Sequence, residues 1–587
     1  MLIRILVLAL AFAPALHAGV VFRNTRVFDG TTVLTGTDVL VEDGKIARVG
    51  KRLKVPDGTE IVDASGKTLL PGLIDAHTHV YGEALTEALM FGVTTELDQF
   101  TAASLAASLR AEQAAGKAKH RADIFSAGIL VTAPKGHGTE YGMDIPTISS
   151  PTEAQAFVDA RVAEGSDWIK IVYDDGSAYG RPIPTVDAAT LRAVIAAAHQ
   201  RQKLAVVHIG TLADARAAID AGADGLVHLF VDKDPDPELG KFVAAHKAFV
   251  IPTLVVLKSV TGVGGAAPLV SDARIEPYLN AVSKNTMERG FPRSPKQPPV
   301  SFAAAEASVR QLLASGVSIL AGSDAPNPGT AHGAALHREL ELLVGAGLTP
   351  VQALTAATSA PARAFRIADR GRIAKGLRAD LLLVNGDPTR DITATRDIAG
   401  IWKGGVAVDR GTYAKAIAEA RTNVGRAPSG IDASVLSDFE SGPTAAFGTG
   451  WEPTADSIAG GKSTGDLKVV DGALSITGTI DPAVPYAWYG AMWSPTPVPM
   501  QPANLSSKQE LSFRAKGDGK TYRVMLFAQS KGMIPLMQTF VAGPEWTEVT
   551  MPWKAFGTDG SDIMAVIFAG GPQPGSFAMQ VDEVRLK

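Results

Sequence analysis

Six side chains that can bind metal ions lie within or beside short apolar runs of the sequence. They are His77, His79, Lys170, His208, His228 and Asp324. A polar group that is buried beside an apolar strand without a partner costs several kcal/mol. Any one of the six could be a hydrogen-bonded core residue, and a single His-x-His motif occurs often by chance. Six such groups in equivalent places predict one shared metal site.

The spacing of the first two histidines suits a common ion. His77 and His79 are two residues apart, and side chains at positions i and i+2 of an extended strand share one face. The chain contains no cysteine, which excludes disulfides, thiol nucleophiles and thiolate ligands. Any metal must therefore be held by histidine, carboxylate or a less usual ligand.

Lys170 is the unusual member, because an ammonium group is a cation and a hydrogen-bond donor. It lies within the apolar run Trp168–Val172. Burial lowers a lysine pKa and makes the neutral amine accessible. A neutral amine can add carbon dioxide to form a carbamate, an anion whose two oxygens can bridge two ions. Two divalent ions bring four positive charges, of which the carbamate, Asp324 and a bridging hydroxide offset three.

Short apolar runs alternate with helical patterns between residues 71 and 370. The runs are Gly72–Asp75, Val93–Thr95, Ile124–Ala127, Trp168–Val172, Leu204–Val207, Leu226–Val227, Phe249–Ile251 and Ser318–Ala321. One helix is predicted after an N-cap at Thr185, with apolar positions from Leu191 to Ala198, and another over Ala213–Ala221. Eight strand–helix units predict an α/β fold, a (β/α)8 barrel, whose active sites lie at the carboxyl ends of the strands. A doubly wound open sheet is the alternative.

Strand patterns flank this region on both sides. Residues 19–70 contain a hairpin signal at Asp43-Gly44, and residues 371–413 return to strand character. We expect these two segments to form one small β domain beside the barrel. Residues 414–434, which include Gly425 and Pro428-Ser429-Gly430, are predicted to be a linker.

The last segment, residues 435–587, differs in composition and predicts a separate β-sandwich. Five of the seven tryptophans lie there, namely Trp451, Trp488, Trp493, Trp546 and Trp553. Exposed tryptophans would stack on sugar rings, which makes carbohydrate a possible partner. The alternative is that they form the core of the sandwich.

The first 18 residues resemble a secretory signal peptide. Arg4 precedes the apolar run Ile5–Ala13, and cleavage would follow Ala15 or Ala18. The alternative is a buried N-terminal strand. No later stretch is apolar enough to span a membrane, so we expect an exported periplasmic or extracellular protein without membrane contact after cleavage. The net charge of −4 and the absence of a long basic run argue against nucleic acid as a partner.

Two motifs carry a family resemblance. Leu70–His79 and Gly376–Leu381 resemble the amidohydrolase superfamily, in its binuclear subtype with a carboxylated lysine, over roughly Val20 to Arg410. The resemblance implies that His77 and His79 bind one ion and that His208 and His228 bind the second. It also implies that Lys170 bridges the two and that Asp324 binds the first ion and acts as general base. Zinc is the expected ion, and manganese, cobalt or iron also suit such ligands.

Within the superfamily the chain resembles the imidazolonepropionase-like and Xaa-Pro dipeptidase-like group. Lys135-Gly136-His137-Gly138 is similar to a loop of that group whose histidine points at the substrate, which makes His137 a predicted substrate contact; its alternative is a solvent-facing loop histidine. Tyr173 and His332 are further candidates, and a packed rim tyrosine is the alternative for Tyr173. Tyr173–Ser177 stands where the dipeptidases usually carry a Gly-Gly pair, which argues against a dipeptide substrate.

These features predict a binuclear metal-dependent amidohydrolase that cleaves a C–N bond of a small molecule with a metal-bridging hydroxide. Imidazolonepropionase lacks the bridging lysine, so a peptide, amide or lactam is favoured as substrate. The alternatives are a mononuclear deaminase-type member and a lactone- or ester-cleaving member of the superfamily. Residues from about Leu436 to Lys587 resemble galactose-binding or CIA30-like jelly rolls, and a glycan-binding protein is the alternative from another class. The residues predict neither the exact substrate nor the oligomeric state.

Overall fold

The computed structural model describes residues 19–139, 145–262, 264–423, 434–456, 462–482, 487–496, 499–531, 535–571 and 573–587. The predicted signal peptide, residues 1–18, lies outside the described residues. Within them, no helix combines the length and apolar character needed to span a membrane. The chain divides into two compact units, the first mainly up to Tyr413 and the second mainly from Ala414. Each unit is described by itself.

The first unit contains an eight-stranded sheet whose strands come from both ends of that unit's sequence. The strand order is β15-β14-β13-β5-β1-β2-β3, with β4 beside β1. The strands are β1 (Val20–Phe28), β2 (Val33–Glu42), β3 (Lys45–Gly50), β4 (Glu60–Asp63), β5 (Lys67–Pro71), β13 (Leu381–Asn385), β14 (Ile398–Lys403) and β15 (Val406–Ala407). β2 and β3 form the hairpin that Asp43-Gly44 predicts, and β13 pairs antiparallel with β5.

Seven of the eight predicted runs are parallel strands. They are β6 (Leu73–Thr78), β7 (Val93–Asp98), β8 (Asp123–Ser126), β9 (Ile169–Tyr173), β10 (Ala205–Ile209), β11 (Gly225–Val227) and β12 (Phe249–Ile251). They form two sheets, β6-β7-β8 and β12-β11-β10-β9. Between the two sheets, the Asp167 N–H donates to Ser126 O of β8 at 2.9 Å, and Val131, which follows β8 in the chain, makes a parallel bridge to Ile171 of β9. The eighth run, Ser318–Ala321, is not a regular strand, but Ile319 bridges Val250 of β12 and the Ala76 N–H donates to Ala321 O at 2.9 Å. Backbone pairing therefore returns to β6 and closes a circuit.

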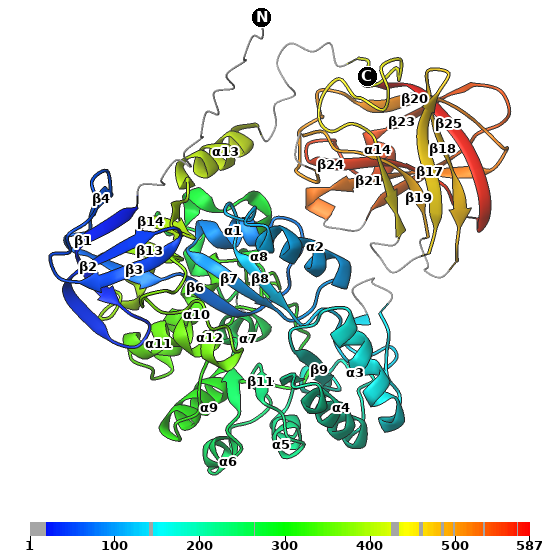
Figure 1. Ribbon diagram of the computed structural model, residues 1–587. Helices are drawn as coiled ribbons and strands as arrows, with labels where there is room; N and C mark the ends of the chain where they lie inside the picture. Colours follow the sequence, from blue (N-terminus) through cyan, green and yellow to red (C-terminus); the bar gives the residue numbers. More distant parts are fainter. Residues whose placement is uncertain are drawn as a thin grey trace, which may run out of the picture. The chain divides into compact units, whose positions relative to one another are not determined.

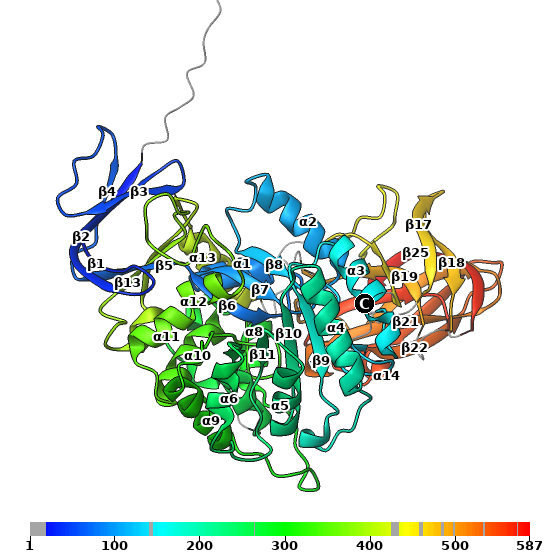
Figure 2. The ribbon, with the colours of Figure 1, turned by 60° about the horizontal axis from the view of Figure 1, so that its bottom comes forward.

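Helices surround this circuit, and Figures 1 and 2 show α4, α5, α6 and α9 along one side of it. The helices are α1 (Ala84–Met90), α2 (Ala103–Ala114), α3 (Ala154–Ala163), α4 (Ala188–Gln200), α5 (Leu212–Asp220), α6 (Leu239–Ala245), α7 (Leu254–Val260), α8 (Ala281–Glu288), α9 (Phe302–Ala314), α10 (Ala334–Gly345), α11 (Pro350–Ala356), α12 (Ser359–Ala364) and α13 (Arg410–Asn423). A large apolar core packs the helices against the strands. A smaller apolar cluster includes Ala76 of β6, Val206 of β10, and Trp168, which directly precedes β9.

Two local predictions were wrong. The N-cap of α4 is Asp187, whose side chain accepts from the Thr190 N–H, whereas the Thr185 hydroxyl accepts from the Asp174 N–H. The predicted linker begins inside α13, because Ala414–Arg421 is rich in alanine, lysine, glutamate and arginine, which favour helix. Residues 424–433 of that linker lie outside the described residues.

The second unit contains two five-stranded antiparallel sheets. One has the order β16-β19-β24-β21-β22 and the other β17-β18-β25-β20-β23. The elements are β16 (Glu452–Ala455), β17 (Thr464–Val470), β18 (Ala473–Ile480), β19 (Tyr489–Trp493), β20 (Glu510–Gly517), β21 (Thr521–Ala528), β22 (Leu536–Val541), β23 (Thr547–Pro552), α14 (Trp553–Phe556), β24 (Ile563–Ala569) and β25 (Gly575–Leu586). Four of its five tryptophans are buried, and Trp546 alone is half-buried. The tryptophans are therefore mainly core residues.

Candidate metal centre

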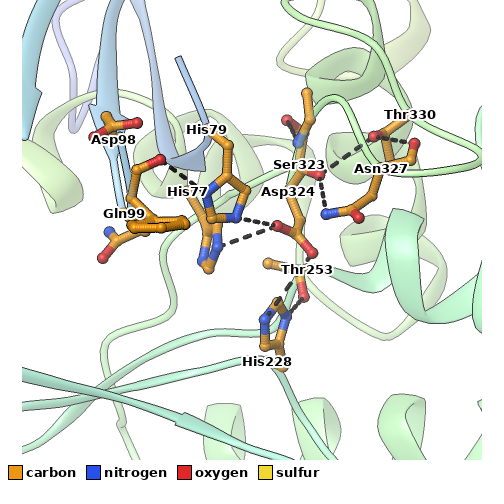
Figure 3. A network of polar contacts seen from close by, with 12 residues as sticks. His77, His79, Asp98, Gln99, His228, Thr253, Ser323, Asp324, Asn327 and Thr330 are labelled. Carbon is orange, nitrogen blue, oxygen red and sulfur yellow. Dashed lines mark hydrogen bonds and ion pairs between the residues drawn. The ribbon is translucent and has the colours of Figure 1, made fainter. Parts of the chain in front are cut away.

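The predicted ligands come together at the carboxyl ends of the strands. His77 and His79 lie at the end of β6, His208 lies in β10, His228 directly follows β11, and Asp324 follows the eighth run. Figure 3 shows His77, His79 and His228 converging on the Asp324 carboxylate. The ligand atoms of His77, His228 and Asp324 all lie within 4.8 Å of one another, which is close enough for a single ion.

The distances connect all four histidines to this group. The Nε2 atoms of His77 and His79 lie 3.2 and 3.1 Å from Asp324 Oδ1, and His228 Nε2 lies 4.0 Å from Asp324 Oδ2. The His208 ring is 4.5 Å from the His228 ring, centroid to centroid, and the His228 ring is 4.9 Å from that of His77. The histidines thus form a continuous cluster, with Asp324 between three of them.

Unusual backbone conformations aim these side chains. His228 and Asp324 have φ angles of 70° and 58°, and Thr253, which contacts His228, has a φ of 48°. Left-handed conformations are unfavourable for residues other than glycine and persist where the surrounding structure over-determines them. Close packing adds to this constraint, because a Cβ at Gly322 would lie 2.9 Å from the His77 Cβ and 3.0 Å from its N.

Hydrogen bonds set the proton positions on the imidazoles. The Thr253 hydroxyl donates to Pro252 O at 2.8 Å and lies 2.7 Å from His228 Nδ1. Because that hydroxyl has only one proton, Nδ1 must be the donor to it, and Nε2 keeps the lone pair that faces Asp324. His77 Nδ1 is buried and has no hydrogen-bond partner among the described residues, and Nε2 has only its contact of 3.2 Å with Asp324 Oδ1. A buried imidazole beside a carboxylate with an unsatisfied ring nitrogen fits a site built for a metal ion.

The charges of the cluster also suit metal binding. Burial lowers the pKa of His77 and of His228 well below the usual range, so both imidazoles are neutral ligands. Burial alone would raise the pKa of Asp324, but the neighbouring His77, His79 and His228 outweigh it and hold the pKa well below its usual range. Neutral imidazoles around a carboxylate are the donor set that zinc and related ions prefer.

Lys170 completes the group from β9. It is 2% exposed, and burial lowers its pKa to about 7, against the opposing charges of Asp324 and Asp98. The charge of Lys170 in turn contributes to the lowered pKa values of His77, His208 and His228. The lowered lysine pKa confirms the direction expected from burial, and a large fraction of the amine is neutral near pH 7.

Comparisons with known proteins show the family of the chain. Residues 68–408 match the model of the amidohydrolase family. The chain belongs to this family. Residues 438–561 match the model of complex I intermediate-associated protein 30 (CIA30), which confirms the second resemblance. Membership of the amidohydrolase family implies the (β/α)8 barrel that the circuit of β6 to β12 indicates.

The relatives of this amidohydrolase match it over most of their own length. The imidazolonepropionase of Deinococcus radiodurans is 26% identical over 375 residues, covering 60% of this chain and 86% of the relative. The dihydroorotase of Mycobacterium tuberculosis is 25% identical over 393 residues, covering 60% and 86%. A putative prolidase from Bifidobacterium longum superposes with a TM-score of 0.54 at 26% identity, covering 68% of this chain and 98% of that one. The prediction of a hydrolase is confirmed.

The three predicted substrate contacts of the amidohydrolase differ in their position relative to the histidine cluster. The His137 ring lies 5.0 Å from the His208 ring, so His137 joins the cluster. Tyr173 does not, because it is three residues from Lys170 and therefore on the opposite face of β9, packed with the helix-side core. His332 does not either, because it is buried and its Nδ1 lies 3.0 Å from Glu96 Oε1. Tyr173 and His332 thus lie apart from the cluster, and their roles as substrate contacts stay predictions.

Sequence reasoning missed three polar residues of the centre. Thr253 sets the His228 proton, Asp98 influences Lys170, and Asp174 lies 3.3 Å from His208 Nε2 through its Oδ2. Asp98 ends β7 and Asp174 directly follows β9, so both occupy the same position as the predicted ligands. The rule that identified the ligands would have found these two carboxylates. Thr253 gave no such signal, because its role depends on a left-handed backbone.

Proposed function

We propose that this protein is a binuclear metal-dependent amidohydrolase that cleaves a C–N bond of a small molecule. The observation that supports it most is a buried lysine with a pKa of about 7 beside a cluster of histidines and one carboxylate. A structural lysine would gain nothing from that position, because burial opposes its charge. A lysine that is to carry a carbamate must be neutral, and this one is poised to be.

The residues divide into two ligand sets. His77, His79 and Asp324 would hold one ion, since the Nε2 atoms of both histidines approach the same carboxylate oxygen. His208 and His228 would hold the second, and Lys170, as a carbamate, would lie between the two. Divalent ions bound there would supply a water of lowered pKa and a Lewis acid for the scissile carbonyl. Zinc is the proposed ion, and manganese, cobalt or iron suit the same donors.

Asp324 is proposed as the residue that moves the proton. Its Oδ1 lies 3.2 and 3.1 Å from the Nε2 atoms of His77 and His79, whereas its Oδ2 lies 4.0 Å from His228 Nε2. Oδ2 can therefore accept a proton from the attacking water and pass it to the leaving nitrogen. Its low pKa keeps Asp324 ionised at neutral pH, as a general base must be.

The proposed substrate class is a peptide, amide or lactam. The curated relatives are named imidazolonepropionase and dihydroorotase, and the solved structure is named a putative prolidase. His137, at the edge of the cluster, is the proposed contact to the substrate. We also propose export through residues 1–18. Carbohydrate binding by the second unit stays a prediction, with the half-buried Trp546 as its candidate side chain.

One observation favours a second candidate function. Only His77, His228 and Asp324, among the described residues, converge tightly enough for a single ion. A mononuclear member of the family, such as a deaminase or a lactone-cleaving enzyme, would need no second site. The two functions differ in the number of ions per chain and in their dependence on Lys170.

A substrate screen tests the proposal. Full-length protein, loaded with zinc or manganese, would be assayed against dipeptides, N-acyl amino acids, lactams and lactones, with His77→Asn as the inactive reference. We expect hydrolysis of at least one C–N substrate and loss of that activity in the variant. Hydrolysis of lactones alone, or deamination without hydrolysis, would contradict the proposal.

A further inference from the structure

We propose that Asp174 is a positioning residue that orients His208 and selects which of its ring nitrogens is free to bind a metal ion. The inference rests on the proposed function, because it assumes that His208 is a ligand. Asp174 is not one of the predicted ligands, and it directly follows β9, the strand that carries Lys170.

Hydrogen bonds hold both the carboxylate and the backbone of Asp174. Asp174 is 5% exposed and directly follows β9. It comes four residues after Lys170, a spacing that places two side chains of an extended strand on the same face. Its Oδ1 accepts from the Gly176 N–H at 2.8 Å, and its own N–H donates to the Thr185 hydroxyl at 3.2 Å. This leaves Oδ2 for His208, whose Nε2 is 3.3 Å away.

The neighbouring strand is shaped to receive this side chain. A Cβ at position 210, just after β10, would lie 2.2 Å from Asp174 Oδ1 and 2.6 Å from its Cγ. Only glycine therefore leaves room for the carboxylate beside His208. A side chain that is held by a backbone N–H and fits beside a glycine is preorganised to meet one partner.

The consequence for His208 concerns its tautomer. A carboxylate only accepts hydrogen bonds, so Nε2 of a neutral His208 must carry the proton that it donates to Asp174. Nδ1 is then the nitrogen with the free lone pair. His228 has the opposite arrangement, because its Nδ1 faces the Thr253 hydroxyl and its Nε2 keeps the lone pair. A carboxylate partner also raises the basicity of the imidazole and fixes its ring orientation.

The test compares metal affinity in Asp174→Asn, Asp174→Ala and the control Asp175→Asn. Asp175 is the exposed neighbour, and its carboxylate accepts only from the Ser177 N–H in the same turn. Zinc binding to the full-length protein would be measured by competition with a chromogenic chelator. We expect both Asp174 variants to bind one of the two equivalents about 10 to 100-fold more weakly, and Asp175→Asn to match the wild type.

A second readout reports the tautomer directly. Protein labelled with ¹⁵N in its histidine rings shows, by NMR, which nitrogen of His208 carries the proton, and His208→Asn assigns the signal. In the wild type we expect Nε2–H only, and in Asp174→Ala a mixture of both tautomers. An unchanged tautomer and unchanged affinity in both Asp174 variants would overturn the inference.

The failure of the inference and that of the proposed function are distinguishable. If His208→Asn keeps both equivalents at wild-type affinity, His208 is not a ligand and the proposed function is wrong. If His208→Asn loses one equivalent and the Asp174 variants lose none, only the inference is wrong.

Gly210→Ala supplies an independent check of the inference. We expect it to weaken metal binding as much as Asp174→Ala does, and we expect no further loss in the double variant, because both changes remove the same contact. Additive losses would contradict it.

Discussion

At the scale of single residues, the chemistry could be predicted because each ligand lies within or at the end of an apolar run. That rule identified His77, His79, Lys170, His208, His228 and Asp324. The structure brings the four histidines and Asp324 into one cluster and places the buried Lys170 where it interacts electrostatically with Asp324. Tyr173 was proposed because it is near Lys170 in the sequence, but side chains alternate along β9, so it faces the helices. His332 was proposed because it follows Asp324 closely, and its buried partner Glu96 lies far away in the sequence. Such through-space partners leave no pattern in the sequence.

The role of Lys170 leads to a prediction at the same scale. Lys170→Ala removes the proposed bridging carbamate, so we expect hydrolysis of the best substrate to fall by about 100-fold or more. Activity of the wild type, depleted of carbon dioxide and then reloaded with metal, should recover faster when bicarbonate is present. Lys233→Ala, at a lysine whose side chain is 59% exposed, serves as the control. Full activity of Lys170→Ala would show that the bridging model is wrong.

At the scale of the elements, the site depends on close approach between neighbouring segments. The eighth run passes β6 so tightly that a Cβ at Gly322 would meet Ile251 Cγ2 at 2.6 Å as well as His77. The N-cap of α7 is Thr253, which has a left-handed backbone conformation. In the first turn of α7, the Val255 N–H donates to the Glu339 carboxylate of α10 at 2.7 Å. The strands were predictable from apolar runs, whereas these approaches depend on backbone geometry that the sequence pattern does not encode.

Gly322→Ala tests this packing. We expect it to destabilise the first unit by about 1–3 kcal/mol and to lower activity, because the added methyl group must displace His77 or Ile251. Gly345→Ala is the matched control, since a Cβ there has nothing within 4 Å and alanine favours the end of α10. Unfolding by denaturant and the hydrolysis assay measure the two effects. Equal stability and activity in the two variants would contradict the packing argument.

Glu339 gives the fold a dependence on pH. Burial raises its pKa to about 8 from a usual value of 4.5, so between these values the folded chain holds a proton that the unfolded chain has lost. Its contribution to stability is therefore complete below about pH 4.5 and is lost as the pH rises through about 8.

Glu339→Gln removes that titration and keeps an acceptor for the Val255 N–H. We expect the variant to exceed the wild type in stability by on the order of 1–3 kcal/mol at pH 8 to 9, with the difference shrinking toward pH 5. Thermal unfolding across this range measures it, and exposed Glu288→Gln is the control. A difference that does not change with pH would contradict the raised pKa of Glu339.

At the scale of the whole molecule, the chain combines a catalytic unit with a β-sandwich that has its own core. The change in composition near residue 435 and the tryptophan-rich tail indicated the second unit, and the burial of four tryptophans shows why that tail is rich in them. The helix α13 at the boundary was missed, because its polar residues were taken as a sign of linker rather than as helix formers.

Separate cores predict separate folding. A chain that ends at Asn423 should fold and keep most of its hydrolytic activity, and a chain of residues 434–587 should unfold cooperatively by itself. Circular dichroism and the hydrolysis assay test the two pieces. An inactive but folded first piece would mean that the second unit contributes to catalysis.

If two ions act together at this site, the metal content of the protein will show it. Full-length protein, loaded with zinc and freed of excess ion, would be analysed by mass spectrometry of its metal alongside Lys170→Ala. We expect about two zinc ions per chain at full activity, and about one in the variant. One ion per fully active wild-type chain, or an unchanged content in Lys170→Ala, would contradict it.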